Sequence, residues 1–270
     1  MKVKSLAVAA VVAIALTGVA LAGPGPTSPL YLTYVNAGDN IVVIQGNSVI
    51  NSFPEAYGYA PYEIPIAISG DVRTIGFTSG ISGGQYTLNG TPTGASYVVP
   101  SVIGSDGVYD STSDGSHNYL VDAATGIVYQ TARDFTNPVA LFTAPGGAAA
   151  WSGITYDVAN HSLWLSGGDT TTVADYSLNG TLLSSFSTGH PANNALAFDP
   201  ADHTLWLVNV DYTGDLEQYS TAGALLSTGP YVGFAEGGEF NEAIPEPGTL
   251  VMFGSGVLGL ACLLRRKIDL

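Results

Sequence analysis

The chain has 270 residues, with 22 acidic residues, seven basic residues and a formal net charge of −15. Five of the seven basic residues lie at the two ends, so the region from Gly23 to Gly248 sets 21 acidic residues against Arg73 and Arg133 alone. Such a region repels nucleic-acid phosphates, which excludes nucleic-acid binding. The single cysteine, Cys262, lies near the C-terminus, so this region has no disulfide, thiol nucleophile or thiolate metal site.

The N-terminus has the three parts of a secretory signal peptide over residues 1–22. They are a positive start (Lys2, Lys4), an apolar core (Leu6 to Leu16) and a small-x-small site (Ala20-Leu21-Ala22). We predict export through a Sec-type pathway and cleavage after Ala22, with Ala20 and Ala22 as the cleavage residues and 23–28 as a linker. The alternative is an uncleaved anchor helix, which the short apolar core disfavours.

Residues 29–241 contain an internal repeat. Residues 154–165 match residues 196–207 at an offset of 42, and residues 176–184 match residues 219–227 at an offset of 43. Weaker copies are found in three earlier segments, Ile41 to Ile50, Tyr86 to Thr91 and His117 to Tyr129. A period of about 43 residues is typical of a structural unit that stacks on copies of itself.

Each unit is predicted to form four short strands. In residues 153–187 these are Gly153 to Asp157, Ser162 to Leu165, Val173 to Leu178 and Thr181 to Phe186. The first alternates apolar and polar residues, which is the pattern of a half-buried strand. Asn179-Gly180 separates the last two strands and predicts a two-residue type I′ hairpin turn, because both central residues of that turn need a positive φ.

Four strands in each period of about 43 residues predict an all-β fold, a β-propeller of about five blades over 29–241. Trp164 and Trp206 fall at equivalent positions and are expected between blades. The pattern around them resembles NHL- and WD-type propeller repeats. A sixth, irregular blade and a two-domain arrangement remain alternatives. The latter joins an N-terminal β-sandwich to a partial propeller, since residues 29–150 hold the weakest copies.

The exported region lacks a recognisable catalytic motif. No metalloprotease helix motif, nucleophile elbow or phosphate-binding loop is found. His161 and His203 fall at the same phase of the repeat, which indicates a structural role in a turn. Asp110 and Asp114 fit two positions of a calcium loop, but position 12 is Val121 instead of a bidentate Glu. We therefore predict no catalytic residues, no cofactor and no metal site, with Asp110 and Asp114 as weak candidates for Ca²⁺.

The C-terminus has a different composition. Pro245-Glu246-Pro247 lies in a linker over 242–248, an uncharged apolar run follows over 249–264, and Arg265, Arg266 and Lys267 begin the tail 265–270. As a helix the run would reach about 24 Å, slightly less than a hydrocarbon core of about 30 Å. We predict a transmembrane helix stopped by the three cations, which stay cytoplasmic. A buried C-terminal helix is the alternative.

The order of Pro-Glu-Pro, apolar run and basic end resembles a PEP-CTERM sorting signal of Gram-negative bacteria. The resemblance implies recognition by an exosortase, a membrane-embedded transpeptidase-like protease that cuts near this motif. It also implies an association with exopolysaccharide-producing, biofilm-forming cells. The expected partners are therefore exosortase, the export machinery and the inner membrane, which holds the C-terminal helix before the protein reaches the cell surface or extracellular matrix.

Two functions are consistent with these features. The favoured one is a non-enzymatic surface or matrix propeller that binds extracellular polysaccharide or an envelope partner. The alternative is a propeller hydrolase or lyase that acts on glycans or peptides outside the cell. Three or more Asp or His residues clustered at one end of the propeller axis would favour catalysis, whereas scattered positions would favour binding.

Overall fold

The structure is a computed structural model that describes residues 25–34, 40–57, 63–78, 80–103, 107–147, 149–191, 193–210 and 213–241. The predicted signal peptide, the Pro-Glu-Pro motif, the apolar run and the basic tail lie outside these residues. Within the described ranges, twenty strands form five antiparallel sheets of four strands each. None of the described segments forms a helix of the length and apolarity needed to cross a membrane.

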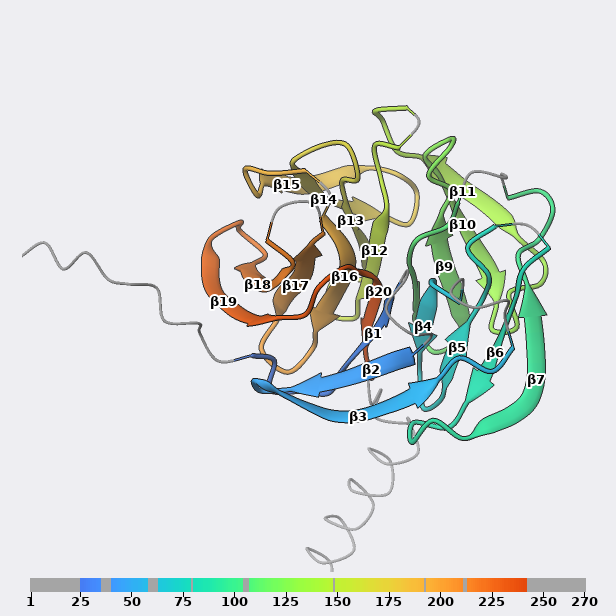
Figure 1. Cartoon of the computed structure of the whole chain (residues 1–270). Coiled ribbons are helices and arrows are strands. Elements are labelled where there is room, and N and C mark those ends of the chain that lie inside the picture. Colours follow the sequence, from blue (N-terminus) through green and yellow to red (C-terminus); the bar gives the residue numbers. More distant parts are fainter. Residues whose placement is uncertain are drawn as a thin grey trace, which may run out of the picture.

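The five sheets are the blades of a propeller, arranged around a common axis (Figure 1). Blade 1 contains β20 (Ala235–Phe240), β1 (Leu30–Tyr34), β2 (Asn40–Gln45) and β3 (Ser48–Pro54). Blade 2 contains β4 (Ile66–Ile68), β5 (Val72–Thr74), β6 (Ser82–Tyr86) and β7 (Pro92–Val98). Blade 3 contains β8 (Ser111–Ser113), β9 (His117–Val121), β10 (Ile127–Ala132) and β11 (Val139–Thr143).

The clearest sequence copies form the other two blades. Blade 4 contains β12 (Gly153–Asp157), β13 (Ser162–Ser166), β14 (Thr172–Ser177) and β15 (Leu182–Ser187). Blade 5 contains β16 (Asn193–Asp199), β17 (Thr204–Asn209), β18 (Asp215–Ser220) and β19 (Leu225–Tyr231). The five-blade prediction is confirmed, and the two-domain alternative is wrong because residues 30–143 form three blades of the same ring. No sixth blade is present among the described residues.

The last strand closes the ring. β20 is the inner strand of blade 1, where it pairs antiparallel with β1 from Leu30↔Phe240 to Tyr34↔Ala235. It also contacts β16 of blade 5 and β4 of blade 2, so the five inner strands form a continuous circle. Gly238 permits the close approach to β16, because a Cβ there would lie 2.8 Å from the Ala195 carbonyl oxygen.

Five apolar clusters fill the five interfaces between blades. Trp164 of blade 4 packs against Leu196 and Phe198 of blade 5, and Trp206 of blade 5 packs against Leu30 and other residues of blade 1. Both indoles are 1% exposed, so the prediction that they lie between blades is confirmed. Each blade therefore buries both faces only because it has a neighbour on each side.

The hairpin at Asn179-Gly180 differs from the predicted type I′ turn. Only Gly180 has a positive φ, at 83°. The Gly180 N–H donates to the Ser177 carbonyl at 2.8 Å, and the Ser177 N–H donates to the Thr181 carbonyl at 3.0 Å. The loop therefore has three residues with glycine in the left-handed position, which leaves a bulge in the following strand. A register shift between Asp175 and Tyr176 shows this bulge.

Ring closure gives a prediction about the boundary of the folded domain. An exported chain that ends at Asn241 is expected to keep the melting temperature of the longer chain, because it retains all five blades. A chain that ends at Phe234 lacks β20 and leaves β1, β4 and β16 without their shared neighbour. We expect it to lose cooperative unfolding when followed by circular dichroism. Equal melting temperatures for the two truncated chains would contradict this account of ring closure.

Candidate functional site

The inner strands of blades 3, 4, 5 and 1 begin around one cavity on the propeller axis. Its volume is about 210 Å³. The polar and aromatic side chains that line it are Tyr109, Trp151, Ser152, Asp169, Asn194 and Glu236. Because residues of four blades line this one cavity, the cavity exists only in the closed ring. We call it the axial pocket.

A chain of hydrogen bonds crosses three blades at the axial pocket. The Ser152 hydroxyl donates to the Asn194 amide oxygen, and the Asn194 amide nitrogen donates to the Glu236 carboxylate. These three residues are spaced by 42 positions, which is the offset of the sequence repeat. The repeat therefore places one polar residue from each of blades 4, 5 and 1 in this chain of hydrogen bonds.

The backbone beside Asn194 is irregular. Ala195 has a φ of 50°, and the pairing of β16 with β17 shifts register between Asn194 and Ala197. A bulge of this kind re-aims the neighbouring side chain and is frequent beside functional sites. Positive φ is uncommon for alanine, so this conformation is held by the surrounding packing.

Loops at the rim of the pocket are tied by backbone hydrogen bonds. The Ala149 N–H donates to the Ala123 carbonyl at 2.6 Å, and the Asp169 N–H donates to the Ala149 carbonyl at 2.9 Å. Ala149 also has a positive φ, at 59°. Trp151 is 4% exposed and donates its indole N–H to the Pro145 carbonyl at 2.7 Å. The rim is therefore held in place by the chain's own hydrogen bonds.

Negative charge dominates the axial pocket. Burial raises the pKa of the Tyr109 phenol, and the charges of Glu236 and Asp169 raise it further. Tyr109 is half-buried, and its ring meets Phe77 edge-on at a centroid distance of 4.7 Å. Two carboxylates and an aromatic ring therefore lie within electrostatic range of one another.

Asp110, which follows Tyr109, connects the inner strands at the axis. Its carboxylate accepts the N–H groups of Ser111 at 2.9 Å, Gly238 at 3.1 Å and Ile154 at 3.3 Å. These donors come from β8, β20 and β12. Asp110 is fully buried, and burial raises its pKa well above the ordinary value although the backbone donors lower it. A side chain predicted as a weak calcium ligand is therefore a structural link between three blades.

Threonine hydroxyls connect further inner strands. The Tyr156 N–H donates to the Thr112 hydroxyl at 2.9 Å, and the Phe198 N–H donates to the Thr155 hydroxyl at 2.9 Å. In each bond, a backbone N–H of one inner strand donates to a threonine hydroxyl on the inner strand of the preceding blade. The axis is thus held by side chain to backbone bonds, which take up N–H groups that would otherwise be buried without a partner.

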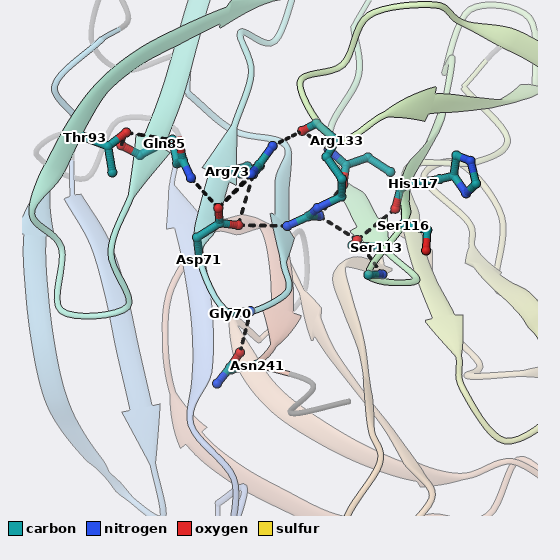
Figure 2. Close-up of polar contacts among 12 residues, drawn as sticks. Gly70, Asp71, Arg73, Gln85, Thr93, Ser113, Ser116, His117, Arg133 and Asn241 are labelled. Atoms are coloured by element: carbon teal, nitrogen blue, oxygen red, sulfur yellow. Dashed lines mark hydrogen bonds and ion pairs between the residues drawn. The ribbon is translucent and has the colours of Figure 1, made fainter. Parts of the chain in front are cut away.

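The opposite end of the propeller holds the two arginines of the exported region (Figure 2). Asp71, in the β4–β5 hairpin of blade 2, accepts hydrogen bonds from Arg73 at 2.8 Å and from Arg133 of blade 3 at 2.8 Å. The Arg73 guanidinium also donates to the Arg133 carbonyl at 2.8 Å, and Arg133 donates to the Ser113 hydroxyl at 2.5 Å. These contacts join blades 2 and 3. We call Asp71, Arg73, Arg133 and Ser113 the Asp71 cluster.

The pKa of Asp71 reflects this arrangement. Burial alone would raise it, but the hydrogen bond and charge of Arg73 and the charge of Arg133 outweigh burial and hold it below the ordinary value. Both guanidinium groups make several bonds within this group of residues, so we assign them a structural role. Neither arginine is among the described residues that line the axial pocket.

The remaining predicted positions have structural roles. His161 and His203 have φ values of 54° and 58°, and their N–H groups donate to the Asp157 and Asp199 carbonyls in equivalent turns. Asp114 accepts the Tyr119 hydroxyl at 2.7 Å. Asp110 and Asp114 lie at opposite ends of β8, about 13 Å apart along the strand, so they do not form one calcium site. Across the described residues, no three His, Cys, Asp or Glu side chains form a group able to hold a metal ion.

The sequence reasoning missed Tyr109, Ser152, Asn194 and Glu236. A signal was present, because three of them recur at the offset of the repeat. The residue type differs at each of these three positions, however, so the repeated letters of the sequence do not reveal them. Asp169 lies between two predicted strands, and nothing local in the sequence indicates that this segment lies over the axis.

Comparisons with known proteins address the two parts of the chain separately. Residues 243–267 match the PEP-CTERM protein-sorting motif. No curated protein matches the sequence. A chain in a crystal structure of a nidogen/laminin complex is similar in fold, with a TM-score of 0.52 and 14% identity over 78% of this chain and 97% of that chain.

Two further solved structures are similar at lower scores. A protein of unknown function from Bacteroides caccae has a TM-score of 0.49 and 11% identity, over 75% of this chain and 72% of that chain. A streptogramin B lyase structure has a TM-score of 0.46 and 16% identity, over 74% of this chain and 68% of that chain. At these identities the likeness concerns the fold alone.

The fold and the axial pocket define the class of the protein, which is a five-bladed β-propeller. The chain also carries a PEP-CTERM sorting signal, as its C-terminal residues indicated. Such signals are recognised by exosortase-type export machinery, so this is an exported, exosortase-sorted propeller protein. Cleavage after Ala22 and the membrane helix over 249–264 remain predictions, because they lie outside the described residues.

The Asp110 carboxylate gives a stability prediction. In Asp110→Asn one amide oxygen can still accept from Ser111 and Gly238, but the NH₂ group would face the Ile154 N–H donor. We expect a loss of about 1–3 kcal/mol in the free energy of unfolding, as for a buried donor left without an acceptor. The exposed control Asp134→Asn should change it by less than about 0.5 kcal/mol. Urea denaturation measures both, and equal stability of the two variants would contradict the role of Asp110.

The Asp71 cluster gives a prediction with a pH dependence. Its folded pKa lies below the unfolded value of about 3.9, so the stabilisation is present above about pH 4 and is lost as the pH falls through the folded pKa. Asp71→Asn should cost about 2 kcal/mol at pH 7, between the effects of exposed and buried ion pairs. The stability difference from the parent chain should shrink below pH 4. A difference that does not change down to pH 2.5, or one no larger than that of Asp169→Asn at pH 7, would contradict this assignment.

Proposed function

We propose that the protein is a non-enzymatic cell-surface or extracellular-matrix propeller whose axial pocket binds extracellular polysaccharide or an envelope partner. The observation that carries this proposal is the position of the pocket relative to the chain ends. Inner strands begin at the pocket, so β20 leaves it at Glu236 and ends at Phe240, about 13 Å further along the strand. β1 begins opposite Phe240, at Leu30.

Both connections to the terminal segments therefore leave from the end opposite the axial pocket. Asn241 lies at that end, where its side chain accepts the Gly70 N–H beside the Asp71 cluster (Figure 2). A propeller held through its C-terminal segment would turn the axial pocket away from the attachment. This is the orientation that a display protein needs to meet a ligand outside the cell.

The lining of the axial pocket favours binding over catalysis. Ser152 donates its hydroxyl proton to an amide oxygen instead of a basic group, and no histidine lines the pocket. Asp169 is the one Asp or His among its described lining residues, whereas three or more would favour catalysis, and Glu236 adds a second carboxylate. The alternative of a glycan or peptide hydrolase or lyase rests on this carboxylate pair alone, because acid–base cleavage uses two such groups.

Binding can be tested with the full-length chain purified in detergent. The ligand is polysaccharide isolated from the cells that produce this protein. Tyr109→Ala should weaken binding about tenfold, or ~1.4 kcal/mol, through loss of an aromatic surface in the pocket. Tyr231→Ala is the matched control, since this tyrosine is 68% exposed on the outer strand β19 and does not line the pocket. Equal binding by both variants would contradict the proposed site. Release of new reducing ends would favour the hydrolase alternative.

Sorting can be tested in cells. Deletion of 244–270 should prevent processing and move the protein away from the cell surface, because it removes nearly all of the PEP-CTERM motif over 243–267. Deletion of 268–270 is the control, since it leaves the motif intact and should not change the distribution. Fractionation and immunoblotting measure the outcome. An unchanged distribution after the longer deletion would show that the motif does not direct this protein.

A further inference from the structure

The charge of the axial pocket limits the ligands that it can bind. Asp169 and Glu236 both line a cavity of about 210 Å³, and no Lys, Arg or His is among the described lining residues. Arg73 and Arg133, the basic residues of the exported region, are held in the Asp71 cluster at the other end. An anionic sugar or a phosphate group would enter a field of like charge, which disfavours its binding.

The hydrogen bonds in the pocket also all donate in one direction. Donation runs from Ser152 to Asn194 and from Asn194 to Glu236, so the chain of bonds ends on a carboxylate. Ionised carboxylates only accept hydrogen bonds, and a second carboxylate lies at Asp169. The pocket is therefore rich in acceptors. A ligand that fits it brings several donors together with positive charge.

A primary ammonium group meets both requirements. It has three N–H donors and a compact positive charge. The Tyr109 ring adds a surface on which a cation is attracted to the aromatic face. The raised pKa of Tyr109 shows the same negative field, since the charges of Glu236 and Asp169 contribute to it after burial.

The volume limits the size of the ligand. About 210 Å³ is less than the roughly 300–1,000 Å³ of pockets that bury drug-sized ligands. The pocket therefore suits a small group such as one sugar ring. A longer polysaccharide would insert a single residue or an end.

We propose that the axial pocket binds an amino sugar through its free ammonium group, as part of a de-acetylated polysaccharide. The inference rests on the proposed binding function and makes it specific. Glu236 and Asp169 accept hydrogen bonds from the ammonium group, and Tyr109 packs against the sugar. Ser152 and Asn194 hold the Glu236 carboxylate in position through their chain of hydrogen bonds. N-acetylation removes the charge and two donors, so the acetylated sugar binds weakly.

The test compares three trisaccharides by calorimetry with the full-length chain in detergent. These are a glucosamine trimer, its fully N-acetylated form and a galacturonic acid trimer. The glucosamine trimer should bind at least tenfold more tightly than the acetylated form, and the acidic trimer should not bind. Trilysine serves as a general polycation, and it should bind at least tenfold more weakly than the glucosamine trimer.

Variants separate the pocket from the overall negative charge. Glu236→Gln and, independently, Asp169→Asn should each weaken binding of the glucosamine trimer at least fivefold. Asp134→Asn removes the same charge on an exposed residue away from the pocket and should have no effect. Because Asp169 is exposed, its substitution keeps the test valid if Glu236→Gln lowers stability.

Four results would overturn the inference. Equal affinity for the acetylated and de-acetylated trimers would show that the ammonium is not recognised, while the binding function itself would stand. Equal effects of Asp134→Asn and Asp169→Asn, or tight trilysine binding, would show attraction to the surface in general. If neither these trimers nor the producing cells' own polysaccharide bind, the proposed polysaccharide function fails together with this inference.

Discussion

The antiparallel pairing of β20 with β1 is the contact on which the rest of the structure depends. Leu30 and Phe240 lie near opposite ends of the exported region, yet they are paired in one sheet. Each blade of a repeat fold is stabilised by its neighbours, so an open row would leave two apolar faces in water. The closed ring instead provides five equivalent interfaces, each filled by its own cluster. Ordering so long a loop has an entropic cost, but that cost grows only slowly with length.

Ring closure also creates the polar chemistry of the axis. The inner strands approach closely enough for Asp110 to accept backbone donors from three blades. At the axial pocket, hydrogen bonds connect blades 4, 5 and 1 through Ser152, Asn194 and Glu236. The same strand direction that gathers these side chains at one end sends both chain ends to the other. In the function that we propose, ligand binding and attachment therefore lie at opposite ends of one axis.

Much of the fold could be predicted from the sequence because its signals are local. The repeat offset, the glycine-containing hairpins and the two buried tryptophans identify four-stranded blades of similar length. The turns at His161 and His203 were also predictable as structural, since they recur at the same phase. The type I′ turn at Asn179-Gly180 was predicted incorrectly, because a bulge in the adjoining strand changes the φ values that Asn-Gly adopts. Propensity describes the turn alone, whereas the blade determines its strand register.

The sequence by itself determined that this is an exported, strongly acidic repeat protein with a PEP-CTERM sorting signal, because charge, period and a linear motif are properties of the chain. Only the tertiary structure decided which acids act together. Asp110 and Asp114 are close in sequence, but β8 separates them. Asp169 and Glu236 are far apart in sequence and share one pocket. The physical reason is that closing a ring gathers one short segment from each blade around the axis, and sequence distance does not predict that proximity.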